Sequence, residues 1–277
     1  MTVLLAFLAG LLIGSFLNVC IHRWPDELSV VQPRSHCPLC ISQIAWYDNI
    51  PLLSYVLLKG RCRCCRTPIP LRYPLVELLN AIIYAGLAYK LGPQPEALKS
   101  ALFASMMLVA IFSDYEQYIL PDEITIGGLV IGLALSPFFL LGRGVSTIIW
   151  LIAEREPEAW VASLTESAVS ALVFGGVLLG VRELYYRVRD IDGLGLGDVK
   201  LMAMIAAFWG SGMALLVLIV GSVAGAASGL LLALLGGRRW DHELPYGTYL
   251  GAAAVIAVVW GDQILAWYWQ AVLPAGA

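Results

Sequence analysis

The sequence predicts an all-α protein that crosses a membrane about eight times and carries a small cytoplasmic cysteine domain between its first two spans. Of its 277 residues, 60% are hydrophobic and only 13% are charged, and the mean hydropathy is +0.80. Soluble domains have about 45–50% apolar and about 25% charged residues. The composition therefore excludes a soluble enzyme, a disordered chain and a nucleic-acid-binding protein, and it predicts the lipid bilayer as the protein's surroundings.

Long apolar runs predict where the helices cross. A helix needs about 20 apolar residues to span about 30 Å of hydrocarbon. We expect spans at Val3–Ile21, Leu75–Leu91, Leu98–Ser113, Ile124–Leu141, Ser167–Val181 and Tyr246–Gln270. The run Leu196–Leu235 is too long for one span, and Gly210-Ser211-Gly212 divides it into two helices.

The distribution of basic residues predicts the orientation. With eight spans, segments 22–74, 182–200 and 236–245 lie on the same side of the membrane, and they hold 13 of the 17 Lys and Arg residues. The positive-inside rule places that side in the cytoplasm. Both termini are then expected outside the cytoplasm.

Five of the six cysteines lie in the segment 22–74. Cys37-Pro-Leu-Cys40 and Cys62-Arg-Cys64-Cys65 form two C-x2-C pairs separated by 21 residues. Two such pairs can present four thiolates to one structural Zn²⁺, whereas redox-active or unliganded thiols are the alternative. We expect Cys37, Cys40, Cys62 and Cys65 as ligands, because two intervening residues allow the chain to turn. Cys64 remains an alternative to Cys65.

Two acidic residues stand out at the cytoplasmic ends of spans. Asp114 lies where the third span ends, and a helix C-terminus disfavours negative charge. Asp198 follows the glycine-rich stretch 193–197. Paired carboxylates can act as an aspartic protease, in which one acid activates water and the other polarises the scissile carbonyl. We expect Asp198, with Lys200 nearby, to be the base and Asp114 to be the acid.

These motifs resemble the type IV prepilin peptidases, which are membrane aspartic proteases of the GxGD class. The resemblance rests on Asp114-Tyr-Glu-Gln-Tyr-Ile-Leu-Pro121-Asp122, Gly195-Leu-Gly197-Asp198-Val-Lys200, Gly14-Ser-Phe-Leu-Asn18-Val with His22-Arg23, Trp46-Tyr-Asp-Asn-Ile-Pro51, Arg72-Tyr-Pro-Leu-Val-Glu77, Pro245-Tyr-Gly247 and the paired C-x2-C motifs. Together they cover most of the chain.

The resemblance implies two activities in the bacterial inner membrane. The enzyme would cleave the basic leader of type IV prepilins or pseudopilins, and it would then methylate the new N-terminal residue with S-adenosylmethionine. Asp114 and Asp198 would be catalytic, and the four cysteines would bind structural zinc. The expected division is a first span at 1–21, a zinc-binding domain with the methyltransferase part at 22–74, and a peptidase domain at 75–277. The sequence places no methyltransferase residue, and Glu77 is a candidate for that activity by position alone.

Two other classes of protein remain as alternatives. A proton- or cation-coupled transporter could use the same acids, although they gather at one membrane edge and no inverted repeat is visible. A zinc-dependent assembly scaffold would need the cysteines but neither acid.

Overall fold

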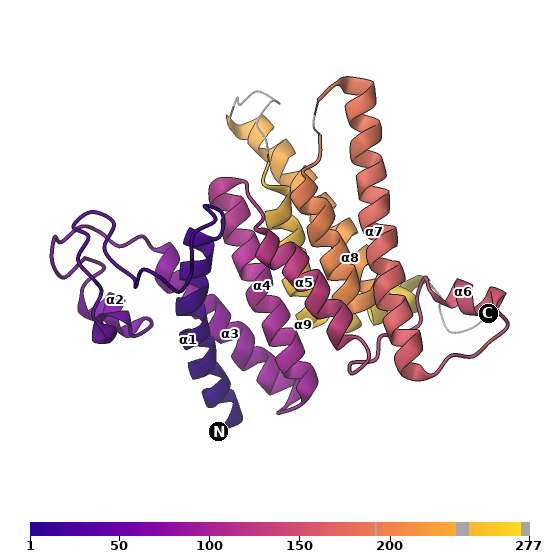
Figure 1. The fold of residues 1–277 in the computed structure, drawn as a ribbon, viewed down its shortest axis with the longest axis horizontal. Coiled ribbons are helices and arrows are strands. Elements are labelled where there is room, and N and C mark those ends of the chain that lie inside the picture. The colour runs from indigo at the N-terminus through magenta and orange to yellow at the C-terminus, as the bar shows by residue number, and fades with distance from the viewer. Residues whose placement is uncertain (192, 237–243, 273–277) are drawn as a thin grey trace. The chain divides into compact units, whose positions relative to one another are not determined.

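The computed structural model describes residues 1–191, 193–236 and 244–272, and their regular structure is helical apart from two isolated β-bridges (Figure 1). The elements are α1 (Thr2–Arg23), η1 (Trp46–Asn49), α2 (Leu53–Leu57), α3 (Arg72–Leu91), α4 (Pro95–Gln117), α5 (Asp122–Leu135), α6 (Thr147–Ile152), α7 (Ala159–Arg189), α8 (Leu196–Gly236) and α9 (Tyr246–Val272). They form two compact units, Met1–Ser113 and Asp114–Ala277. The expected all-α class is confirmed.

The structure shows part of the expected set of eight spans, and the number eight stays a prediction. Among the described residues, five helices are long and apolar enough to cross a bilayer, namely α1, α3, α4, α7 and α8, and α9 has a shorter apolar part at Tyr246–Gly261. The predicted span Ile124–Leu141 is wrong at its end, since α5 has only 14 residues and stops at Leu135. Pro137 explains this, because proline has no N–H to donate to the Leu133 carbonyl, which instead accepts a 2.8 Å hydrogen bond from the Ser136 hydroxyl. The apolar run continues, but the helix does not.

The expected division of the long run after Leu196 is confirmed as a break inside α8. Gly210 has φ 75° and ψ 179°, outside the helical range, while the helix continues on both sides. A positive φ of this kind strains any residue with a Cβ, so glycine is required here. The break leaves a first half that begins with the Asp198 turn and a second half that begins at Ser211.

In the first unit, α1 and α3 pack closely through small residues. A Cβ on Gly10 would lie 2.6 Å from the Ala81 Cα, and one on Gly14 would lie 2.7 Å from the Glu77 Cα. The Asn80 amide also donates a 2.7 Å hydrogen bond to the Gly10 carbonyl. Small residues and interhelical hydrogen bonds are the usual means of joining helices in lipid. This pair carries the cysteine domain, which connects α1 to α3.

In the second unit, a buried acid that the sequence did not single out holds three segments together. Glu166 of α7 is only 2% exposed. Its carboxylate accepts hydrogen bonds from the Ser146 N–H at 2.9 Å, the Ser170 hydroxyl at 2.8 Å, and the Ser211 N–H and hydroxyl at 3.1 and 2.7 Å. It therefore satisfies the free N–H groups at the start of α6 and at the break in α8.

We predict that Glu166→Ala destabilises the protein much more than Glu183→Ala, which removes a half-buried acid of the same helix that pairs only with the Arg187 side chain among the described contacts. Each buried donor left without an acceptor costs about 1–3 kcal/mol, so the thermal unfolding midpoint in detergent should fall by several degrees. Glu166→Gln should fall between the two, since it keeps one carbonyl oxygen. Equal midpoints for Glu166→Ala and Glu183→Ala would contradict the role given to Glu166.

Candidate active site and metal site

Asp114 lies in the last part of α4 and is tied to the start of α9. Its side chain is buried, with the residue 6% exposed. The carboxylate Oδ2 accepts hydrogen bonds from the Thr248 N–H at 2.6 Å and the Thr248 hydroxyl at 3.0 Å. Thr248 is in the first turn of α9, where N–H groups have no partner within the helix. The Asp114 carboxylate therefore caps a helix that begins far away in the sequence.

Asp198 lies in the first turn of α8 and is also buried, with the residue 8% exposed. Its carboxylate accepts a hydrogen bond from the Gly195 N–H, and it lies close enough to Asp114 for the two charges to interact. The structure therefore brings together the two acids on which the sequence interpretation depends, and it does so inside one compact unit.

Leu120 and two glycines determine how closely the elements around the acids approach. A Cβ on Gly197 would lie 3.0 Å from the Leu120 Cβ. A Cβ on Gly247 would lie 2.8 Å from the Leu120 Cδ1 and 3.1 Å from the Asp114 Cγ. The starts of α8 and α9 can therefore both contact the Asp114–Leu120 segment only because these two positions lack side chains.

Two further side chains lie near the acids, and one of them, Lys200, has a different partner from the one expected. The Lys200 ammonium forms an ion pair with Asp122 at 2.7 Å, so the described contacts give it a different partner from the expected Asp198. Tyr246, at the start of α9, interacts electrostatically with Asp198, and its hydroxyl lies 2.8 Å from the Ser222 hydroxyl. The assignment of acid and base to the pair stays a prediction.

The cysteine domain brings four thiols into one cluster. The sulfurs of Cys37, Cys40, Cys62 and Cys65 all lie within 4.8 Å of one another. The Cys37–Cys65 and Cys40–Cys62 separations are 3.7 and 4.0 Å. A tetrahedral site with Zn–S bonds of about 2.3 Å separates its sulfurs by about 3.8 Å. These four thiols could hold a metal ion, and Cys64 lies outside the cluster and is exposed.

Each C-x2-C pair lies in the same kind of turn. The Cys37 N–H donates to the Ser42 carbonyl at 2.9 Å, and the Cys62 N–H donates to the Thr67 carbonyl at 2.8 Å. Ile41 and Arg66, which follow the second cysteine of each pair, have φ of 57° and 60°. The repeated geometry explains why Cys62 and Cys65, with two residues between them, form the second pair.

Glu77, the candidate chosen by position, supports the cysteine domain. Its carboxylate accepts a 2.8 Å hydrogen bond from the Leu52 N–H, and Leu52 has a positive φ of 58°. Its contacts lie within the first unit. The described geometry therefore makes Glu77 an anchor for the loop before α2.

Comparisons with known proteins agree with this geometry. Residues 8–91 match the bacterial peptidase A24 N-terminal domain, and residues 101–230 match the type IV leader peptidase family. Proteins described as prepilin leader peptidase/N-methyltransferase are 35% identical in Aeromonas hydrophila, over 95% of this chain and 92% of that protein, and 33% identical in Pseudomonas putida, over 95% and 92%. The chain belongs to the type IV leader peptidase family. No solved structure gives a significant match.

The two family models match different parts of the chain, and each part contains one of the two candidate sites. The N-terminal family domain includes the cysteine cluster, and the leader peptidase model includes both Asp114 and Asp198. The chain spans almost the full length of these relatives. It is therefore a multi-pass membrane enzyme of the leader peptidase family, with its acids and its cysteines in separate matched regions.

We predict that Gly247→Ala lowers peptidase activity at least about tenfold, because the new methyl group must displace Leu120 or the Asp114 carboxylate, and small misplacements of reacting groups have large effects on rate. Gly127→Ala is the matched control, since a Cβ there meets no atom within 4 Å. Initial rates at equal amounts of membrane-inserted protein measure the effect. Unchanged activity of Gly247→Ala would show that the close approach is not needed.

Proposed function

We propose that this chain cleaves the basic leader peptide of type IV prepilins or pseudopilins at the cytoplasmic edge of the bacterial inner membrane, and that it methylates the N-terminal residue so exposed. The observation that carries the proposal is the meeting of Asp114 and Asp198, two buried acids from distant parts of the sequence. The relatives' descriptions name both activities. No described feature favours the transporter or scaffold alternatives over this function.

The pair would work as an aspartic protease dyad. One carboxylate would take a proton from a water molecule while that water attacks the scissile carbonyl. The other acid would donate a hydrogen bond to the carbonyl oxygen. In a dyad of this kind the active form would carry one proton between the two carboxylates. Thr248 would hold the Asp114 carboxylate in one orientation while the reaction proceeds.

The cysteine cluster would hold one structural Zn²⁺ through Cys37, Cys40, Cys62 and Cys65. A site closed by four thiolates leaves no coordination position for substrate, so the metal would stabilise the fold of the domain 22–74. We place the methyltransferase part in this domain and the peptidase in 75–277. The basic segments favour a cytoplasmic position for this domain and an outside position for both termini.

We predict that Asp114→Asn and Asp198→Asn each reduce prepilin cleavage by at least about a hundredfold, the lower range for loss of a general acid or base. Glu123→Gln, an exposed acid beside Asp122, is the matched control and should cleave normally. Conversion of a prepilin-like substrate by each purified variant is the measurement. Normal processing by either Asn variant would remove the protease assignment.

We predict that the double variant Cys37→Ser and Cys40→Ser loses its bound zinc, whereas Cys64→Ser keeps it. The first variant removes two of the four clustered thiols, and the second removes one outside the cluster. Metal analysis of the purified proteins gives the ratio of zinc to chain. Methylation should fall more than cleavage, and retained zinc in the double variant would disprove this set of ligands.

A further inference from the structure

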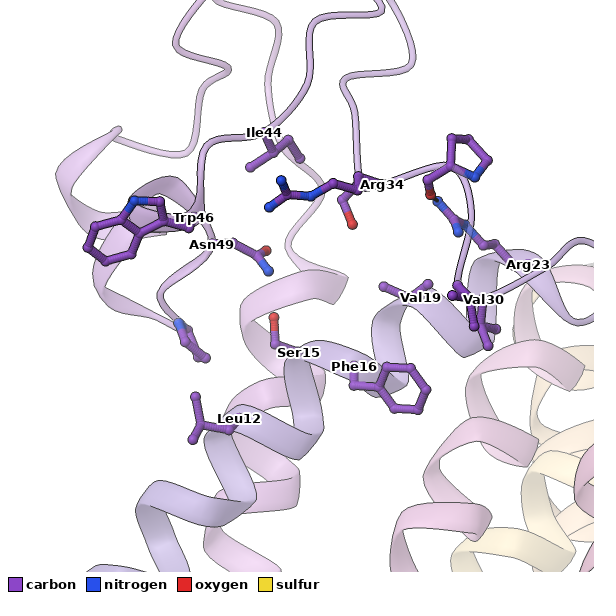
Figure 2. A pocket seen from close by; sticks show the side chains of 14 residues that line it. Leu12, Ser15, Phe16, Val19, Arg23, Val30, Arg34, Ile44, Trp46 and Asn49 are labelled. Carbon is purple, nitrogen blue, oxygen red and sulfur yellow. Dashed lines mark hydrogen bonds between the residues drawn. The ribbon is translucent and has the colours of Figure 1, made fainter.

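A cavity of about 390 Å³ lies in the first unit, between α1 and the cysteine domain (Figure 2). Its volume is within the usual range for small-molecule sites. Ser15 and Phe16 of α1 form part of one wall, and Arg34 and Asn49 of the cysteine domain face them, with Trp46 at the edge. The lining joins polar groups to two aromatic rings, a combination typical of ligand sites.

The wall that carries Arg34 is held in place by hydrogen bonds. The Arg23 guanidinium donates to the carbonyls of Ser29 and Pro33 at 2.8 and 2.7 Å. On the other side of Arg34, the Ile44 N–H donates to the Ser35 carbonyl at 2.9 Å. Arg23 is therefore occupied by the protein's own backbone, and the loop it anchors positions the next arginine.

The wall that carries Trp46 and Asn49 is tied to the second cysteine pair. Arg63, between Cys62 and Cys65, donates two 2.6 Å hydrogen bonds to Asp48 of η1. These bonds, together with the charge of the guanidinium, hold the pKa of Asp48 below its usual value. The fold of the cysteine cluster and the shape of the cavity are thus connected through one ion pair.

Arg34 is the charged group that the protein leaves available. Figure 2 shows its side chain reaching into the cavity toward Asn49. Among the described residues, its guanidinium has no hydrogen-bond or ion-pair partner, and no Asp or Glu lines the cavity. An arginine in such a site favours an anionic group, most effectively a carboxylate or phosphate.

We propose that this cavity binds the methyl donor, S-adenosylmethionine, with its carboxylate on Arg34. The inference rests on the proposed methyl transfer. The Asn49 amide supplies a donor and an acceptor for the polar edge of an adenine or ribose, and Phe16 and Trp46 lie at opposite edges of the cavity, where an aromatic face can attract the sulfonium charge. The cavity lies within residues matched by the family's N-terminal domain.

The chemistry of the transfer requires little from the protein besides this positioning. The substrate's amine nitrogen bonds to the methyl carbon, the carbon–sulfur bond breaks, and its electron pair stays on sulfur. The amine's proton passes to water, and S-adenosylhomocysteine is released. A site that orients the donor and shields it is sufficient, because a correctly oriented pair of reactants accounts for much of the rate.

Equilibrium binding of radiolabelled S-adenosylmethionine to the purified full-length protein tests the proposal directly. Arg34→Ala and Asn49→Ala should each weaken binding, Arg34→Ala by about tenfold or more, the usual scale for losing a charged hydrogen-bond partner. Arg61→Ala, an exposed arginine of the same domain outside the cavity, is the matched control. Prepilin cleavage and zinc content should stay at wild-type values in all three variants, which shows that they are folded.

Three results would overturn the assignment, and they can be told apart. Wild-type affinity in both Arg34→Ala and Asn49→Ala would place the donor elsewhere and leave the proposed function intact. Cleavage without any donor binding by the wild-type protein would remove the methyl-transfer half of that function as well. If Arg34→Ala instead loses a copurifying anionic phospholipid while donor affinity is unchanged, the cavity is a lipid headgroup site.

Discussion

The hydrogen bonds from Thr248 to the Asp114 carboxylate are the interaction on which the active site depends. An ionised group in a membrane-spanning helix is costly unless it has partners. Asp114 obtains them from the free N–H and hydroxyl of the first turn of α9. The same contact ties the first turn of α9 to Asp114, so the acid that we propose as catalytic also determines part of the fold.

The same physical rule explains the other buried acids. Glu166 is surrounded by donors from α6, α7 and the break in α8, and Glu77 accepts a hydrogen bond from the Leu52 N–H. In each case a carboxylate satisfies backbone groups where a helix begins or a loop turns sharply. Asp198 differs, because its described carboxylate contacts are the Gly195 N–H and the charge of Asp114. Glu77 and Glu166 therefore serve the fold, whereas Asp114 and Asp198 interact with each other, which is the feature that supports the proposed reaction centre.

The parts of the molecule that sequence predicts well are those decided locally. The cysteine pairs turn within six residues, so their spacing favours Cys62 with Cys65 while leaving Cys64 as an alternative. Gly210 is recognisable because Gly210-Ser211-Gly212 interrupts an apolar run. Span counting failed at α5, where hydropathy continues past Ser136 but Pro137 ends the helix. Glu166 and Thr248 could not be identified, because their partners come from residues far away in the chain. The sequence predicts the pairing of Asp114 with Asp198 because both acids lie at the cytoplasmic ends of spans, and the motifs that resemble a family support that prediction.

The ion pair between Arg63 and Asp48 connects the cysteine cluster to the cavity within one small domain. A segment of about 50 residues buries too little apolar surface to hold a ligand site rigidly without further support. Four thiolates around one metal ion would fix both turns, and Arg63 would transmit that order to η1 with Trp46 and Asn49. The α1–α3 pair fixes the opposite wall through its close glycine contacts. The metal would then influence binding at the cavity without touching the ligand, because the order of the wall formed by η1 would depend on the metal.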